Sequence, residues 1–357
     1  MRRGVRVVTT ATQAADAARP RESDADGGMA SLLKRFIEAR VPGAEGLMVD
    51  GLARMSGGLS RENWVFRARW RDPAGSHDLP LIMRRDPPAS LLVTQRRDEF
   101  AVLRALESTP IAAPPVLWMD EDGSVLGSPS LIMSRMQGEC DPLVLTSDRP
   151  EAARLALAGD FLTLLVQVQE VDWRRLGLDA ALKDPGPDAG SVELDRWEGE
   201  LRRVALEPVP EMELVLRWLR ERVRPSGRTV LVHGDFKPGN ALISGGRISA
   251  LLDWETAHLG DPLEDLGWIT NPVRSKEHQI AGRWERADIV AAYSAATGMA
   301  VGDEELTWWN VFSCWKLAVI VLTGVHAFVD GTFDRVHQSP TWLVRAMLRM
   351  IVSGEAR

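Results

Sequence analysis

The 357-residue chain is 45% hydrophobic, which excludes a fully disordered protein, and its length favours two lobes over a single small domain. Its formal net charge of −7 and pI near 5.5 argue against a nucleic-acid binder that relies on phosphate neutralisation. Cys140 and Cys314 lie far apart and outside any metal-binding spacing, so we expect reduced thiols in a cytoplasmic protein.

The N-terminal segment 1–28 contains no apolar run long enough for a signal-peptide core and no apolar helix face, so it predicts a flexible tail. The next segment, 29–41, predicts an amphipathic helix, because its apolar residues recur at helical spacing: Leu32, Leu33, Phe36 and Ile37. A nucleotide-binding lobe is expected to begin with this helix and to extend over residues 29–137.

Strand patterns dominate this lobe. Those at 47–54, 63–71 and 79–86 are separated by turn-forming residues and predict an antiparallel meander. The segments PPVLWMDEDG and SPSLIMSRMQGE supply two more strands, and VTQRRDEFAVLRALEST has helical spacing. The sequence therefore predicts a five-stranded antiparallel sheet with a helix, that is, an α+β lobe.

The first turn of the meander, MSGGLSRE, carries the pair Gly57 and Gly58, whose backbone N–H groups can approach a phosphate. Ser60 and Asn63 would add side-chain donors. A plain hairpin turn has the same glycine chemistry, so both interpretations stay open at this point.

Strand alternation in LIMRR places Arg84 on the opposite face from Leu81 and Met83, where it can act as a cation for nucleotide phosphates. Glu99, near the start of the following helix, can point back towards Arg84. The alternative is a pair of solvated charges on separate elements.

The segment before Gly138 suits a connector between lobes, where backbone groups of Ser134 and Met136 can hydrogen-bond an adenine edge. Met133 would then face the floor of the cleft, although Met133 and Met136 can equally be core residues.

From about residue 148 the pattern is helical, and residues 138–357 are predicted to form a catalytic and substrate-binding lobe. The helical patterns at 192–206 and 210–224 are interpreted as scaffold or pocket wall. The apolar run 311–329 approaches membrane-spanning length, but Lys316 and His326 interrupt it, so we expect a buried helix and no membrane contact. These two side chains either pair within the lobe or face the substrate.

The strand RTVLVHGDF ends in the motif HGDFKPGN, and Pro238 and Gly239 favour a loop there. Asp235 can accept a proton from a substrate hydroxyl, and Lys237 can neutralise a moving phosphoryl group. Asn240 offers a neutral oxygen to Mg²⁺.

A predicted hairpin around Gly245 and Gly246 returns the chain to Asp253, a second acid at a strand end. An acid, an amide five positions later and this second acid match the template for phosphoryl transfer, with Asn240 and Asp253 as the metal ligands.

The motifs HGDFKPGN, LLDWE and GDPLEDLGW resemble the aminoglycoside phosphotransferase and choline kinase family, whose fold is similar to that of eukaryotic protein kinases. The resemblance covers roughly residues 45–350, and LIMRRDPPASLL is closest to phosphotransferase-like segments fused to acyl-CoA dehydrogenases. It implies a two-lobed protein-kinase-like fold.

Residue by residue, the resemblance implies Asp235 as the base, Asn240 and Asp253 as Mg²⁺ ligands, and Glu99 as the partner of Arg84, which stands where the family's antibiotic kinases have lysine. Asp261 and Asp265 would brace the catalytic loop.

The expected activity is transfer of the γ-phosphoryl group of ATP, with GTP not excluded, to the hydroxyl of a small molecule. The acceptor is either an aminoglycoside or a hydroxyacyl-CoA or other metabolic alcohol. A nucleotide-binding pseudokinase without turnover is the alternative of another class. The oligomeric state stays open.

Overall fold

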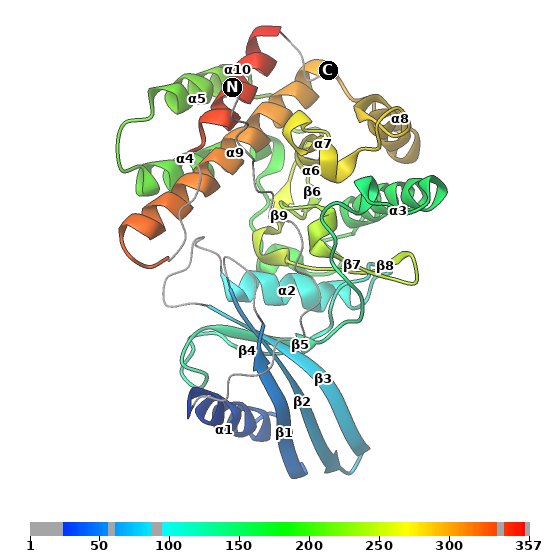
Figure 1. The fold of residues 1–357 in the computed structure, drawn as a ribbon, viewed down its shortest axis with the longest axis vertical. Helices are drawn as coiled ribbons and strands as arrows, with labels where there is room; N and C mark the ends of the chain where they lie inside the picture. Colours follow the sequence, from blue (N-terminus) through cyan, green and yellow to red (C-terminus); the bar gives the residue numbers. More distant parts are fainter. Residues whose placement is uncertain (1–23, 56–60, 87–94, 334–338, 354–357) are drawn as a thin grey trace, which may run out of the picture.

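The computed structural model describes residues 24–55, 61–86, 95–333 and 339–353. Figure 1 shows a sheet at one end of the molecule and a larger, helix-rich part at the other, with α2 lying between them. This is the predicted α+β arrangement of a kinase-like fold.

The five-stranded antiparallel sheet is confirmed, with strand order β1-β2-β3-β5-β4. Its strands are β1 (Glu45–Arg54), β2 (Glu62–Asp72), β3 (Gly75–Arg85), β4 (Val116–Asp120) and β5 (Ser130–Ser134). The meander prediction is correct, since β2 pairs with β3 without a break from Glu62 opposite Arg85 to Asp72 opposite Gly75.

Alternation along β3 separates two environments. Leu81 and Met83 are fully buried in a small core with α1 (Asp24–Glu38), whereas Arg84 points to the opposite face.

The helix prediction began at Met29, but α1 begins at Asp24, so residues 24–28 belong to the helix rather than to a tail. The rest of the predicted tail lies outside the described residues.

The other face of the sheet packs on α2 (Arg96–Leu106) and shares its core with the helix-rich part. Val102 and Leu103 of α2 and Leu131 and Met133 of β5 all belong to this larger core. Met133 is 4% exposed, which agrees with a core residue rather than an open cleft floor.

The helix-rich part holds two small antiparallel pairs, β6 (Val230–Val232) with β9 (His258–Gly260) and β7 (Ala241–Ser244) with β8 (Arg247–Leu251). Its helices are α3 (Glu151–Gln169), α4 (Ala189–Val204), α5 (Pro210–Arg222), α6 (Leu263–Ile269), α7 (Ser275–His278), α8 (Arg286–Thr297), α9 (Asp303–Val329) and α10 (Thr341–Ser353).

Helix α9 is the buried helix that the apolar run predicts. Among the described residues it alone has the length and hydropathy of a membrane span, with a mean hydropathy of 1.7 over its most apolar window. Of that window, 61% is buried inside the protein, and Asn310, Ser313 and Lys316 make polar contacts to neighbouring segments. These features are those of a core helix.

Candidate active site

The loop after β6 is held by one buried carboxylate. Asp265 in α6 accepts the backbone N–H groups of His233 at 2.7 Å and Gly234 at 3.0 Å, and its side chain is completely buried. Burial raises the pKa of Asp265, although the two N–H donors favour the ionised form. Asp265 therefore braces this loop, as predicted, whereas Asp261 accepts the N–H of Leu263, the first residue of α6, at 2.7 Å.

His233 orients the loop as a neutral ring. Its Nε2 donates to the Leu252 carbonyl at 2.9 Å, and its Nδ1 accepts the backbone N–H of Asp235 at 3.2 Å. A carbonyl can only accept, so the proton lies on Nε2. The ring thereby ties the loop of Asp235 to the segment that carries Asp253.

Asp235 is the centre of a small polar group. Its Oδ2 accepts from Lys237 Nζ at 2.6 Å and from Asn240 Nδ2 at 2.9 Å. The Asn240 amide also donates to the Asp235 carbonyl at 3.0 Å, so its Oδ1 is left as an acceptor. The side chain of Asp235 is 23% exposed, which leaves it accessible to a substrate hydroxyl.

The hairpin β7–β8 brings Asp253 back beside this group, as predicted. Gly245 and Gly246 form the turn with φ of 58° and 79°, and the Leu252 N–H donates to the Asn240 carbonyl at 2.7 Å. Among the described residues, Asp253 is the only non-glycine residue with positive φ, at 66°. Such a conformation costs about 1 kcal/mol or more and is concentrated at functional sites.

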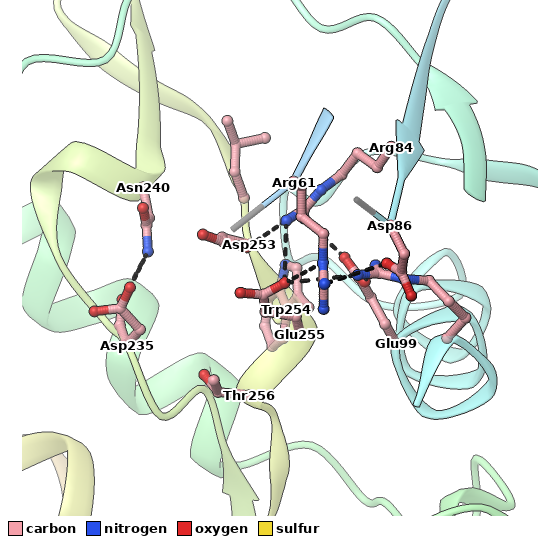
Figure 2. Close-up of polar contacts among 12 residues, drawn as sticks. Arg61, Arg84, Asp86, Glu99, Asp235, Asn240, Asp253, Trp254, Glu255 and Thr256 are labelled. Atoms are coloured by element: carbon pink, nitrogen blue, oxygen red, sulfur yellow. Dashed lines mark hydrogen bonds and ion pairs between the residues drawn. The ribbon is translucent and has the colours of Figure 1, made fainter. Parts of the chain in front are cut away.

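Arg84 lies between Glu99 and Asp253, as Figure 2 shows. Its Nη1 contacts Glu99 Oε1 at 2.8 Å and its Nη2 contacts Asp253 Oδ1 at 2.6 Å. The predicted contact between Arg84 and Glu99 is present, and Asn63 lies opposite Arg84 on β2. Burial opposes the charge on Arg84, but the surrounding carboxylates outweigh it and raise its pKa. For Asp253, burial is outweighed by the Arg84 guanidinium, and its pKa is lowered.

Sequence reasoning missed the rest of this ion network. Arg61 contacts Glu255 at 2.8 Å and Asp86 at 3.2 Å, and Arg96 contacts Asp86 at 2.8 Å and pairs with Glu99. Burial, followed by the charge of Asp253, raises the pKa of Glu255 to about 7. The signal available was Glu255 in LLDWE, whereas the arginines carried no recognisable motif.

The remaining predicted nucleotide contacts are less complete. Gly57, Gly58 and Ser60 lie outside the described residues. The Ser134 N–H donates to the Pro115 carbonyl at 2.9 Å and is therefore not available to a base. The half-buried Met136 follows at the edge of the sheet, and no backbone hydrogen bond of Met136 is seen within the described part of the chain.

The oxygen atoms of this site suit a hard divalent cation. Asp253 keeps Oδ2 beside the Oδ1 that Arg84 holds, and Asn240 keeps Oδ1. Carboxylate and amide oxygens are the ligands that Mg²⁺ takes from proteins. With the carboxylate of Asp235 on one side of Asp253 and Arg84 on the other, the site has the parts that phosphoryl transfer requires (Figure 2).

The fold and this site define a phosphotransferase of the kinase-like class. The chain belongs to the phosphotransferase enzyme family, whose model matches residues 52–309.

Among curated proteins, the chain is similar to acyl-CoA dehydrogenase family member 10 of Mus musculus, with 30% identity over 54% of this chain and 18% of that protein. It is also similar to acyl-CoA dehydrogenase family member 11 of Rattus norvegicus, with 28% identity over 71% of this chain and 33% of that protein. The chain thus spans about a third or less of these relatives.

Solved structures confirm the fold. An aminoglycoside phosphotransferase-type protein of Ralstonia eutropha JMP134 superposes with a TM-score of 0.66 at 22% identity, over 91% of this chain and 96% of that one. A thermostable mutant of the aminoglycoside phosphotransferase APH(4)-Ia, in complex with AMP-PNP and hygromycin B, superposes with a TM-score of 0.58 at 17% identity, over 92% and 100%. At such identities, the likeness concerns the fold alone.

Proposed function

We propose that this protein transfers the γ-phosphoryl group of ATP to a hydroxyl of a small molecule, in the presence of Mg²⁺. The observation that carries the proposal is the convergence of Asp235, Asn240 and Asp253 with the pair Arg84 and Glu99 in one site. The family membership and the nucleotide analogue bound by APH(4)-Ia support it.

Each side chain has a defined task in this reaction. The acceptor hydroxyl oxygen attacks the γ-phosphorus, the bond to the β,γ-bridging oxygen breaks, and the hydroxyl proton passes to Asp235. Lys237, whose Nζ donates to Asp235 Oδ2 at 2.6 Å, orients that carboxylate and would neutralise charge on the transferred group. Arg84, released from Asp253, neutralises phosphate oxygens while Glu99 keeps it oriented.

Mg²⁺ would be held by Asn240 and Asp253, and when bound it would supply charge neutralisation to the phosphate oxygens. Arg84 and a cation would compete for the Asp253 carboxylate, which Arg84 already holds through Oδ1. Nucleotide binding should therefore depend on Mg²⁺.

For the acceptor, the sequence relatives favour a metabolic alcohol such as a hydroxyacyl-CoA, since the similar segments belong to acyl-CoA dehydrogenase family members. The fold neighbours leave an aminoglycoside as the second candidate. A pseudokinase is the least supported alternative, because Asp235, Asn240 and Asp253 are all in place.

Nucleotide binding measured by thermal shift, with and without Mg²⁺, followed by ATP consumption over panels of hydroxyacyl-CoAs and aminoglycosides, separates these candidates. Asp235→Asn keeps the side-chain shape and should lower turnover by about 10² to 10⁴-fold while nucleotide binding persists. The exposed Asp122→Asn serves as the matched control. Full turnover in Asp235→Asn would refute the assigned base, and binding without consumption with every acceptor would favour the pseudokinase.

A further inference from the structure

Lys316 is a buried cation that the mechanism above does not use. It lies on α9, is 2% exposed, and its ammonium donates to the Gly234 carbonyl at 2.8 Å. The same Nζ lies 5.2 Å from the ring centre of Trp197 and 5.3 Å from that of Trp268, within cation–π range. A fully desolvated lysine is costly, so these contacts must compensate for its lost hydration.

The carbonyl that Lys316 holds belongs to the peptide that joins Gly234 to Asp235. The N–H of the same peptide donates to His233 Nδ1 at 3.2 Å. Both polar groups of the peptide are thus fixed by side chains, one cationic and one neutral. The preceding peptide, which joins His233 to Gly234, is held in the same way. Its N–H donates to Asp265, and its carbonyl accepts from Thr256 Oγ1 at 3.0 Å.

A chain of buried charges keeps Lys316 in place from behind. Glu264 Oε1 lies 3.3 Å from Lys316 Nζ, and Glu264 Oε2 lies 3.0 Å from His258 Nε2. His258 Nδ1 lies 2.9 Å from the Thr256 carbonyl, which can only accept, so Nδ1 carries a proton. Nε2 faces Glu264 and, at 3.6 Å, Glu193 of α4, so it is protonated as well and the ring is an imidazolium.

Glu193, His258 and Glu264 could alternatively hold a metal ion, because their potential ligand atoms all lie within 4.8 Å of one another. The local charges argue against it. Lys316 contacts Glu264 and Arg196 contacts Glu193 at 3.3 Å, so both carboxylates already have a cationic partner. A divalent cation would leave the buried group with a large positive excess, whereas a proton on His258 adds a single charge.

We propose that Lys316 is a positioning residue for phosphoryl transfer: held by Glu264, whose other oxygen pairs with the His258 imidazolium, it fixes the Gly234–Asp235 peptide and thereby the carboxylate of Asp235. The inference rests on the proposed function for its catalytic consequence. It also makes α4, through Glu193, part of the support of the catalytic loop, whereas sequence reasoning assigned this helix to scaffold or pocket wall.

The test compares Lys316→Met, which keeps the length of the side chain but removes the donor, with Lys316→Arg, which keeps a cation. Val319→Ala is the matched control, since Val319 is fully buried on the same helix and its apolar side chain has no donor for the loop. With any acceptor identified above, Lys316→Met should lower kcat by about 10²-fold, because small displacements of a catalytic group have effects of this size. The Kd for nucleotide should stay within about twofold, and Lys316→Arg should recover at least about tenfold of the lost kcat.

Hydrogen exchange gives a readout that needs no turnover. In Lys316→Met, the amides of His233, Gly234 and Asp235 should exchange at least about tenfold faster than in the wild type, whereas in Val319→Ala they should not. If Lys316→Met does not fold, the double variant Lys316→Met/Glu264→Gln, which removes both charges, is measured in the same way.

Unchanged exchange in the loop of a folded Lys316→Met variant would overturn the proposal, and so would an equal loss of kcat in Val319→Ala. If the wild type turns over no acceptor, the proposed function fails on its own, and the exchange data still decide whether Lys316 fixes the loop.

Discussion

The ion network around Arg84 makes a quantitative prediction about two substitutions that look equally severe. The network contains the three guanidinium groups of Arg61, Arg84 and Arg96 and four carboxylates. These carboxylates are Asp86, Glu99, Asp253 and Glu255. With every group ionised there is one negative charge in excess, which agrees with the raised pKa of Glu255, about 7.

Asp253→Asn removes the excess charge. Glu255 Oε2 lies 3.6 Å from Arg84 Nη2. Glu255 can then ionise and pair with the Arg84 guanidinium in place of Asp253. Asparagine also tolerates the positive φ of 66° at this position. We therefore expect a loss of only about 1 kcal/mol in the free energy of unfolding. Arg84→Met instead leaves four carboxylates with two guanidinium groups. It should lower the free energy of unfolding by about 3–5 kcal/mol, as for other buried ion pairs that lose one partner.

The pH dependence supplies a second, independent check. The pKa of Glu255 in the folded protein lies above its ordinary value, so its protonated form is favoured by folding. This contribution to stability is present at acidic pH and is lost as the pH rises through about 7. In Asp253→Asn that loss should disappear, because Glu255 then ionises at a lower pH.

Urea unfolding of the nucleotide-free variants between pH 5 and pH 8.5 measures both effects, with Asp78→Asn as control for an exposed ion pair worth at most about 1 kcal/mol. Equal losses of stability in Asp253→Asn and Arg84→Met would refute the charge-balance reasoning. So would an unchanged pH dependence in Asp253→Asn.

Two further predictions concern the loop and its support. Gly234→Ala should cost at least about 2 kcal/mol in urea unfolding, since φ is +80° and a Cβ would lie 2.8 Å from the Thr256 carbonyl oxygen. Gly282→Ala, with φ of +69° and open space, isolates the backbone cost, and an equal loss there would rule out the steric explanation. For His258, the effect of burial is outweighed by the charges of Glu193 and Glu264, and the pKa of the ring is raised to about 9. The protonated ring therefore stabilises the folded protein fully below about pH 6.5, and this contribution is lost as the pH rises through 9. The size of this contribution is on the order of 3 kcal/mol, and His258→Gln should remove it from the pH dependence of unfolding. An unchanged decline in stability as the pH rises through 9 would contradict the imidazolium.

Much of the fold and the central motif could be predicted from the sequence because the signals are local. Strand alternation placed Arg84 on the face opposite Leu81 and Met83, and the Gly245–Gly246 turn between apolar strands indicated that Asp253 returns to Asn240. In these cases the geometry depends on residues close together in the chain.

The contacts that the sequence did not predict join distant segments. The Arg84 contact to Asp253 spans 169 residues. Arg61, another cation of the same ion network, lies in no recognisable sequence motif. From the sequence, Glu193 is interpreted as an ordinary polar residue on the solvent face of an amphipathic helix, although in the structure it is only 4% exposed. Its burial depends on where α4 packs, and the helical period alone carries no information about the neighbour that a polar residue meets. The predicted boundary between residues 137 and 138 and the assigned roles of the site residues stay predictions.

The core shared by α2, β5 and the helix-rich part restricts how the protein can be dissected. Cutting the chain at the predicted boundary would expose Val102, Leu103 and Leu131 on one fragment and their apolar partners on the other. Such fragments should be prone to aggregation when produced separately. Segmental labelling for NMR should therefore rely on ligation of one refolded chain, and libraries for directed evolution should keep the sheet and the helix-rich part together as a single unit of selection.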